Sequence, residues 1–267
     1  MVDHSNNTVY LVTGANRGIG LALVSLLATR PNTTVLATAR SFVDPPAVFS
    51  SVISHSTSVI IPTLLDESKP HISSETLPLR LNLVGINHVN VVIANAGTAA
   101  NGFKSVFDTS EEDYRADFEV NTLGPIKLFK GVWRLLQEGL KGQKGGKFVV
   151  IGSSVGSIGG LVTPEGEWEG GRLVCGSYGL SKAGVGWWVM KLRAELKAQG
   201  KEMVVGVVHP GWVKTTMGQG LADAVGFEGG PPLGVEESAR GVVEQIAKLT
   251  MDNSGQFWRW DGGVLPW

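Results

Sequence analysis

The chain has 267 residues, of which 43% are hydrophobic and 18% are charged, and its formal net charge is −1. This balance is typical of a globular protein with a large core, and it argues against nucleic acid or an anionic membrane as a partner. A single cysteine, Cys175, excludes an internal disulfide, and no stretch has the roughly 18 apolar residues that a membrane span requires. The N-terminus is polar and lacks a signal-peptide pattern, so we expect a cytoplasmic protein.

Short runs rich in valine and isoleucine alternate with longer helical patterns, which is typical of a parallel sheet with crossover helices. The strand-like runs cover residues 9–12, 34–38, 59–61, 89–94, 148–151, 204–208 and 256–260. The helical patterns cover residues 19–27, 72–84, 111–137, 177–198 and 236–249. No internal repeat or low-complexity linker divides the chain. We therefore expect a single α/β domain over residues 1–267, a doubly wound (Rossmann-type) parallel sheet of about seven strands with helices on both faces, and ligands at the carboxyl ends of the strands.

A glycine-rich segment joins the first predicted strand to the first predicted helix. It reads Gly14-Ala15-Asn16-Arg17-Gly18-Ile19-Gly20. Gly14 allows a sharp turn, Gly18 lets a diphosphate approach the backbone, and Gly20 lets the helix pack closely against the strand. The N–H groups at the helix start then favour an anion. The segment predicts a dinucleotide site, and a tight connection without a ligand is the alternative.

The second predicted strand ends in Thr38-Ala39-Arg40, without the acidic residue that would bind the ribose 2′-OH of NAD. Arg40 can instead pair with a 2′-phosphate, and Arg17 is a second candidate for this contact. The sequence therefore predicts a preference for NADP(H). An ordinary surface arginine is the alternative interpretation of Arg40.

Tyr178 and Lys182 are four residues apart on a predicted helix, so both project from one face. We expect the Lys182 ammonium to lower the pKa of Tyr178 from its usual value near 10, so that the phenol exchanges a proton with a carbonyl or hydroxyl oxygen. Lys182 can also donate to the nicotinamide ribose.

Ser153 and Asn121 complete a candidate catalytic group. Ser153 follows the predicted strand 148–151, where its hydroxyl could polarise a substrate carbonyl. Asn121 lies inside the predicted helix 111–137, and it could open the helix locally and hold a water that relays protons to Lys182. A turn residue and a surface polar residue are the alternatives for Ser153 and Asn121. No ligand cluster surrounds His209, so no metal site is expected.

The motifs occur along the chain in the order of a known family. They read Thr13-Gly14-x-x-x-Gly18-x-Gly20, Asn95-Ala96-Gly97, Asn121, Ser153, Tyr178-x-x-x-Lys182 and Pro210-Gly211-x-Val213-x-Thr215. Together they resemble the short-chain dehydrogenase/reductase family over nearly the whole chain. The resemblance implies a Ser-Tyr-Lys triad with an assisting Asn, and hydride transfer between a nicotinamide and a carbonyl carbon, with Tyr178 as the acid in reduction.

The same resemblance assigns further cofactor contacts. The turn at Asn95 would flank the adenosine and support the central strand, and Asp66 matches an acid that contacts the adenine. Val213 and Thr215 would hold the nicotinamide carboxamide. Residues 211–232 would cover the substrate, and the family commonly pairs through the helix at 177–198 and the one before it, as a homodimer or homotetramer.

One departure from the family lies beside the predicted substrate pocket. Ser153 and Tyr178 are 25 residues apart, whereas the usual gap is roughly half of that. We expect an insertion at about 157–175, and Ser154 could replace Ser153 as the catalytic serine. Trp168 in this insertion and Trp212 in the lid lie in predicted loops and could stack on an aromatic or apolar substrate, and Met217 lies in the same lid.

The two ends of the matched region resemble a narrower group. The stretches Thr8-Val9-Tyr10-Leu11-Val12-Thr13-Gly14 and Trp260-Asp261-Gly262-Gly263-Val264-Leu265-Pro266-Trp267 are similar to those of fungal norsolorinic acid ketoreductases. This resemblance implies a fungal source, secondary metabolism and a polyketide aromatic ketone as substrate. A non-catalytic NADP(H)-binding redox sensor and an alcohol dehydrogenase running in the oxidative direction are the alternatives.

Overall fold

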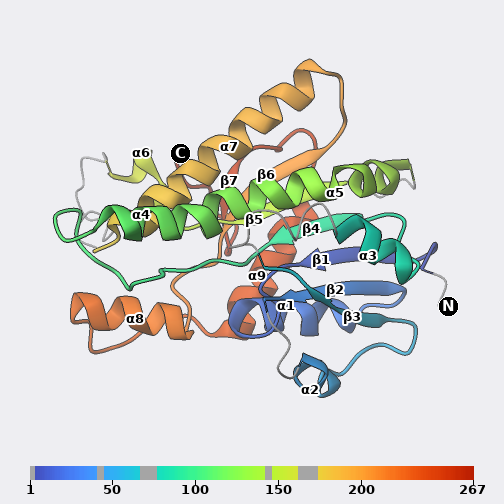
Figure 1. The fold of residues 1–267 in the computed structure, drawn as a ribbon, viewed down its shortest axis with the longest axis horizontal. Coiled ribbons are helices and arrows are strands. Elements are labelled where there is room, and N and C mark those ends of the chain that lie inside the picture. The colour runs from blue at the N-terminus through green and yellow to red at the C-terminus, as the bar shows by residue number, and fades with distance from the viewer. Residues whose placement is uncertain (1–3, 41–44, 67–76, 142–145, 162–173) are drawn as a thin grey trace.

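The computed structural model describes residues 4–40, 45–66, 77–141, 146–161 and 174–267. Its strands form one parallel sheet of seven strands in the order β3-β2-β1-β4-β5-β6-β7 (Figure 1). Their bounds are β1 Thr8–Val12, β2 Thr33–Ala39, β3 Val59–Leu64, β4 Val91–Ala94, β5 Lys147–Ile151, β6 Val204–His209 and β7 Phe257–Arg259. The doubly wound fold expected from the alternating pattern is confirmed, and each strand overlaps a predicted run.

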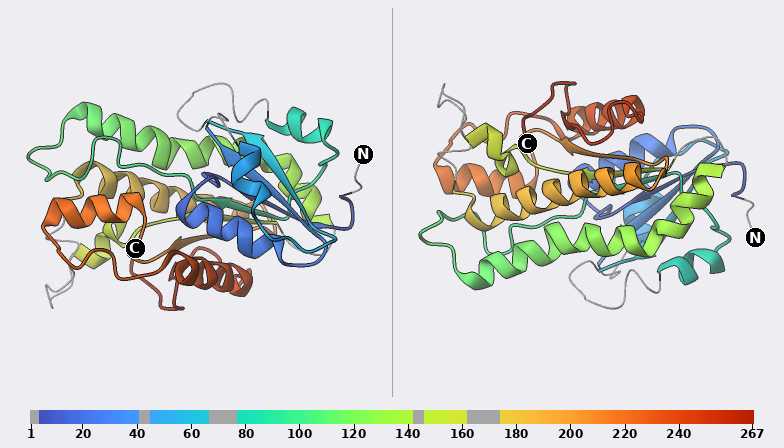
Figure 2. Two further views of the ribbon diagram at one scale, coloured as in Figure 1. Left: turned by 90° about the horizontal axis from the view of Figure 1, so that it is seen from below. Right: turned by 90° about the horizontal axis from the view of Figure 1, so that it is seen from above.

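Helices cover both faces of the sheet (Figure 2). Their bounds are α1 Gly18–Ala28, α2 Pro45–Ser50, α3 Leu77–Leu83, α4 Glu111–Phe118, α5 Gly124–Lys141, α6 Ile158–Leu161, α7 Gly176–Ala198, α8 Thr216–Val225 and α9 Val235–Lys248. One core cluster joins the sheet to α3, α5 and α7, and a second joins it to α1, α2 and α9. Because both faces are packed, strands such as β2 are buried along their whole length. No helix in the described residues is long and apolar enough to cross a membrane.

The predicted helix 111–137 is not continuous. It is divided into α4, a π-helical segment at Glu119–Leu123 and α5. The π segment contains Asn121, which is fully buried and whose side chain is held by groups outside the helix. The interruption falls at Asn121, where the sequence analysis expected the helix to open locally, although the apolar periodicity gave no sign of a π turn.

The predicted lid at 211–232 is not only a loop, because it contains the helix α8. The Thr215 side chain caps this helix by accepting from the Gly218 N–H at 3.0 Å, and Gly226 ends it in the left-handed region at φ 67°. The sequence did not predict this helix, because Gly218 and Gly220 lie inside it and glycine has a low helix propensity. The short helices α2 and α6 were also not predicted. Part of the predicted helix 72–84 and most of the expected insertion lie outside the described residues.

Candidate active site

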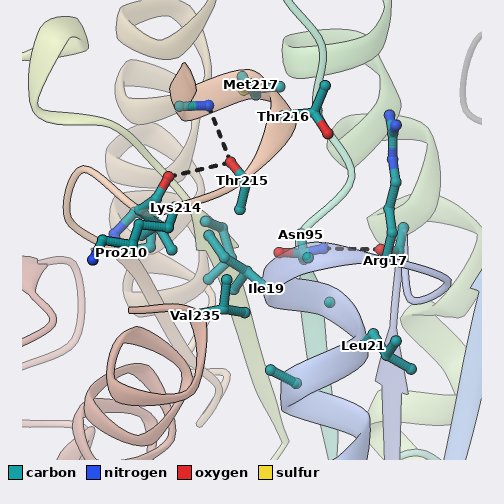
Figure 3. Close-up of a pocket in the computed structure, with 18 of the residues that line it drawn as sticks. Arg17, Ile19, Leu21, Asn95, Pro210, Lys214, Thr215, Thr216, Met217 and Val235 are labelled. Carbon is teal, nitrogen blue, oxygen red and sulfur yellow. Dashed lines mark hydrogen bonds between the residues drawn. The ribbon is translucent and has the colours of Figure 1, made fainter. Parts of the chain in front are cut away.

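A large cavity of about 1830 Å³ opens at the carboxyl ends of the strands. Most of the residues singled out in the sequence line it, namely Gly14, Asn16, Arg17, Gly18, Ile19, Gly20, Arg40, Asn95, Ala96, Gly97, Ser153, Tyr178, Lys182, Pro210, Gly211, Trp212, Val213, Thr215 and Met217. Figure 3 shows Thr215 and Met217 at the start of α8, across the cavity from Arg17 and Ile19 at the start of α1. Trp168 lies outside the described residues. Of the described residues, Asn121 and Asp66 do not line the cavity, although Leu65, next to Asp66, does.

Gly14 and Gly20 of the glycine turn leave no space for a side chain. Gly14 adopts φ +60°, and a Cβ there would lie 2.9 Å from the Cα of Ala96. A Cβ on Gly20 would lie 2.2 Å from the Gly14 carbonyl oxygen, so α1 packs directly on the turn. The first N–H groups of α1 therefore border the cavity without intervening side chains. This cradle fits the diphosphate of a dinucleotide, which helix N-termini favour.

The end of β4 is tied to the end of β1 beside this turn. The Thr13 hydroxyl oxygen accepts from the backbone N–H groups of Asn95 at 3.1 Å and Ala96 at 2.9 Å. The Asn95 side-chain amide donates in return to the Thr13 carbonyl at 2.8 Å and contacts the Gly14 carbonyl (Figure 3). These bonds hold the Asn95-Ala96-Gly97 turn against the glycine turn and support the central strands.

Two arginines, Arg40 and Arg17, also line the cavity. Arg40 follows β2 directly, Arg17 precedes α1, and both side chains are exposed and line the cavity. Because neither is committed to the core, both guanidinium groups are available to a phosphate bound in the cavity.

Ser153 and Tyr178 meet across the cavity floor. Ser153 follows β5 and Tyr178 lies in the first turn of α7; both line the cavity, and the Ser153 side chain acts to lower the pKa of Tyr178. Ser154 instead uses its backbone N–H, which donates to Nδ1 of His209 at 3.3 Å. Of the two serines left open by the sequence, Ser153 is the one whose side chain acts on the pKa of Tyr178.

The electrostatic surroundings of Tyr178 differ from the expectation. Burial raises the pKa of Tyr178 above its usual value, and the hydrogen bond from Ser153 opposes this only in part. The Lys182 ammonium lies 5.7 Å from the ring centroid and donates to the Ile151 carbonyl at 2.9 Å. Desolvation of the phenolate therefore outweighs the stabilisation that we expected from the neighbouring cation. Tyr178 consequently keeps its proton at neutral pH.

Asn121 lies behind the cavity wall rather than in it. Its carbonyl oxygen accepts from the Thr98 N–H at 2.8 Å, and its amide donates to the Thr98 carbonyl at 2.8 Å and to the Ser181 hydroxyl at 2.9 Å. A Cβ on Gly97 would lie 3.2 Å from Asn121 Oδ1 and 3.4 Å from Lys182 Nζ. Both polar groups thus face the same small space beside Gly97.

Aromatic side chains also line the cavity. Trp212 donates its indole N–H to the Gly218 carbonyl at 2.9 Å and packs on Phe227, with ring centroids 5.2 Å apart. Phe103 meets Tyr178 edge to face, with ring centroids 5.5 Å apart, and lines the cavity. Sequence reasoning missed Phe103, because it lies in a loop without a motif, far from Tyr178 along the chain.

His209 also lines the cavity, and its pKa lies far below the usual value for histidine. Burial and the nearby Arg259 charge lower its pKa to about 4, so the ring is neutral near pH 7. A neutral imidazole can accept at Nδ1, which agrees with its bond from Ser154. In the described residues no group of His, Cys, Asp and Glu could hold a metal ion.

Comparisons with known proteins agree with this architecture. The family model of the short chain dehydrogenases matches residues 8–225. The short-chain dehydrogenase srdF of Neurospora crassa is 31% identical over 98% of this chain and 99% of its own length. The norsolorinic acid ketoreductase of Aspergillus parasiticus is 32% identical over 97% of this chain and 91% of its own length. Among solved structures, the NADPH-bound carbonyl reductase from chicken fatty liver has a TM-score of 0.77 and 28% identity, covering 98% of this chain and all of that one.

Proposed function

Since the chain belongs to the short-chain dehydrogenase family, we propose that it is an NADPH-dependent ketoreductase in which Tyr178 is the general acid. The observation that carries the proposal is that Ser153, Tyr178 and Lys182 line the same cavity as the glycine turn, with the Lys182 ammonium 5.7 Å from the Tyr178 ring centroid. When bound, NADPH supplies the hydride that reduces the carbonyl carbon. A hydrophobic, aromatic ketone is the proposed substrate, and an alcohol is the product.

The side chains of the cavity have complementary roles in this reaction. The Ser153 hydroxyl donates a hydrogen bond to the carbonyl oxygen and polarises it. Tyr178 transfers its phenolic proton to the same oxygen as negative charge develops there. At neutral pH the phenol carries the proton that reduction consumes, as a tyrosine of ordinary pKa near 10 also does. Lys182 and Asn121 border the space beside Gly97, where a relayed water would return a proton to Tyr178.

The preference for NADPH is proposed to depend on Arg40, with Arg17 as a second contact. Replacing Arg40 by alanine removes a charge-assisted contact to the 2′-phosphate, which is worth about 1.5–3 kcal/mol. The KM for NADPH should therefore rise about tenfold or more, whereas the KM for NADH should not change. Arg115→Ala, which removes an exposed arginine on α4, is the matched control. A wild-type preference for NADH would contradict the proposal.

An aromatic substrate is proposed because Trp212, Phe103 and Met217 line the cavity, and Phe103 contacts the Tyr178 ring. Several relatives bear the name norsolorinic acid ketoreductase, which supports a polyketide-derived aromatic ketone. NADPH oxidation should be measured with a panel of hydrophobic ketones and aldehydes that includes an anthraquinone side-chain ketone.

The control for this assay is Tyr178→Phe, which removes only the transferable proton. It should fold and bind NADPH as the wild type does, with kcat lower by about 100-fold or more. Undiminished turnover in this variant would show that Tyr178 is not the acid. Tight NADPH binding without turnover of any compound in the panel would favour a redox sensor, and faster oxidation of alcohols at neutral pH would favour an alcohol dehydrogenase.

A homodimer is proposed to form over the outer face of α7. Trp188 packs against Phe129 and Phe148 in the core, whereas the adjacent Trp187 is 68% exposed. Leu180, two turns earlier on α7, is exposed as well. Sedimentation of the wild type and of Trp187→Glu tests this arrangement, and a wild-type monomer at all concentrations would contradict it. A cytoplasmic location stays a prediction from the sequence.

A further inference from the structure

The helix α4 and the π turn after it present a regular series of buried polar side chains. Asp113, Asp117 and Asn121 are spaced four residues apart and are 4%, 1% and 0% exposed. Residues at this spacing lie on one face of a helix, here the face toward α7 and the loop after Gly97. Only Asn121 belongs to the motifs of the sequence.

Asn121 and Asp117 bind their surroundings in the same way. Asn121 bonds to the backbone of Thr98 and to the hydroxyl of Ser181. One turn earlier, Asp117 accepts from the Ala100 N–H at 2.8 Å and from the Ser177 hydroxyl at 2.7 Å. Each side chain thus links the loop after β4 to a serine of α7.

The two serines lie next to the candidate catalytic residues of α7. Ser181 immediately precedes Lys182, and Ser177 immediately precedes Tyr178. The first turn of α7 has no side-chain cap within the described residues, because its N-cap residue Cys175 makes no such bond. The bond from Ser177 to Asp117 is therefore a direct side-chain anchor of the turn that carries Tyr178.

We propose that Asp117 is a positioning residue for Tyr178, acting through Ser177 and through the loop at Ala100. This inference rests on the proposed function of Tyr178 as the acid. A buried carboxylate is tolerated only when its oxygens are well hydrogen-bonded, and bonds to a charged acceptor are about twice as strong as neutral ones. The anchor therefore resists rotation of the first turn of α7, on which the position of the phenol depends.

The charge of Asp117 has a second effect at the same place. Among the described residues, the titratable groups found to act on or contact Tyr178 are Cys175, Asp117 and Lys182. The first two raise the pKa of Tyr178. Removing the charge at 117 while keeping the shape should therefore lower the pKa of Tyr178 and move the alkaline limb of the reductive pH profile to lower pH.

The experiment compares Asp117→Asn, Ser177→Ala and the double variant with the wild type, after turnover and its loss in Tyr178→Phe have been established. Asp117→Asn retains an acceptor for the Ala100 N–H and loses the charge. Ser177→Ala removes the anchor and leaves the charge. Glu112→Gln, which neutralises an exposed carboxylate on the same helix, is the matched control.

We expect kcat to fall by about tenfold or more in each single variant, because displacement of a reacting group by about 1 Å can cost about 100-fold. The KM for NADPH should stay within about twofold, and the double variant should lose less than the product of the two single losses. The alkaline limb should move only in the variants at Asp117. Amide hydrogen exchange in residues 176–182 should accelerate in both single variants relative to Glu112→Gln, which is a readout that requires no turnover.

Two results would overturn the inference. The first is a kcat within about twofold of the wild type in Ser177→Ala, with unchanged exchange in residues 176–182. The second is multiplicative losses in the double variant, because independent effects would exclude a path through Ser177. Absence of turnover in the wild type would refute the proposed function instead, and the exchange measurement would still decide whether Asp117 anchors the turn.

Discussion

Gly156 lies in the turn after Ser153, at the point where this turn contacts α7. Replacing Gly156 by alanine should therefore disturb the active site through this contact alone. A Cβ at this position would lie 2.7 Å from the backbone N of Ala183, 2.7 Å from the carbonyl carbon of Lys182 and 2.8 Å from the Lys182 Cβ. Ordinary contact begins at 3.4 Å, and helix backbone atoms cannot rotate away as a flexible side chain can. The turn and the helix must therefore separate by several tenths of an ångström.

This separation acts directly on the pair of Ser153 and Tyr178, because the turn carries one partner and α7 carries the other. A displacement approaching 1 Å should lower kcat by about 10- to 100-fold. Overpacking of this kind should also lower the free energy of unfolding by about 1–3 kcal/mol. The affinity for NADPH should fall by less than kcat, because the glycine turn lies on other elements and the clash reaches the cofactor only through α7.

The assay is NADPH-dependent turnover of the best ketone of the panel, together with NADPH affinity and urea unfolding. Gly220→Ala is the matched control, since among the described residues no atom outside its own helical turn lies within 4 Å of the added Cβ. It lies inside α8 and should stabilise the protein by about 0.5–1 kcal/mol without loss of turnover. A Gly156→Ala enzyme with wild-type kcat and stability would refute the reasoning that this contact controls the catalytic distance.

Three further predictions concern stability. The pKa of His209 is lowered to about 4 in the folded protein, so the unfolded chain takes up the proton first as the pH falls below about 6.5. The free energy of unfolding should therefore decrease between about pH 6.5 and pH 4. In urea unfolding over this range, His209→Gln should show a weaker dependence of this free energy on pH. Bonds from Lys104, the Ser110 N–H and Asn101 hold the pKa of Asp113 below its usual 3.8, so its contribution is present above about pH 4 and is lost on acidification. Asp113→Asn should therefore lower the Tm more at about pH 7 than at about pH 3, and equal losses would contradict this sign. Trp267→Ala removes a partly buried ring stacked on Phe257 at 5.2 Å and should cost about 2 kcal/mol in urea unfolding, less than a fully buried aromatic; an unchanged midpoint would show that the stack contributes nothing.

Local rules were enough to predict much of this protein from its sequence. The alternation of buried strands and amphipathic helices predicted the doubly wound sheet, because the hydrophobic pattern of each segment reflects the periodicity and burial of that strand or helix. The glycine turn could be recognised because each glycine meets a local steric requirement of a strand, a turn and a helix that are adjacent along the chain. The common face of Tyr178 and Lys182 followed from the helical repeat.

Long-range contacts decided the rest. The proposed choice of Ser153 over Ser154 depends on the effect of Ser153 on Tyr178, 25 residues away along the chain, and the π turn at Asn121 depends on partners at Thr98 and Ser181. The pKa of Tyr178 was expected to fall because the sequence displays the neighbouring lysine, whereas it rises because the fold buries the phenol. Desolvation and alignment depend on atoms that the chain brings together from distant positions, so they are properties of the tertiary structure and leave no local pattern in the sequence.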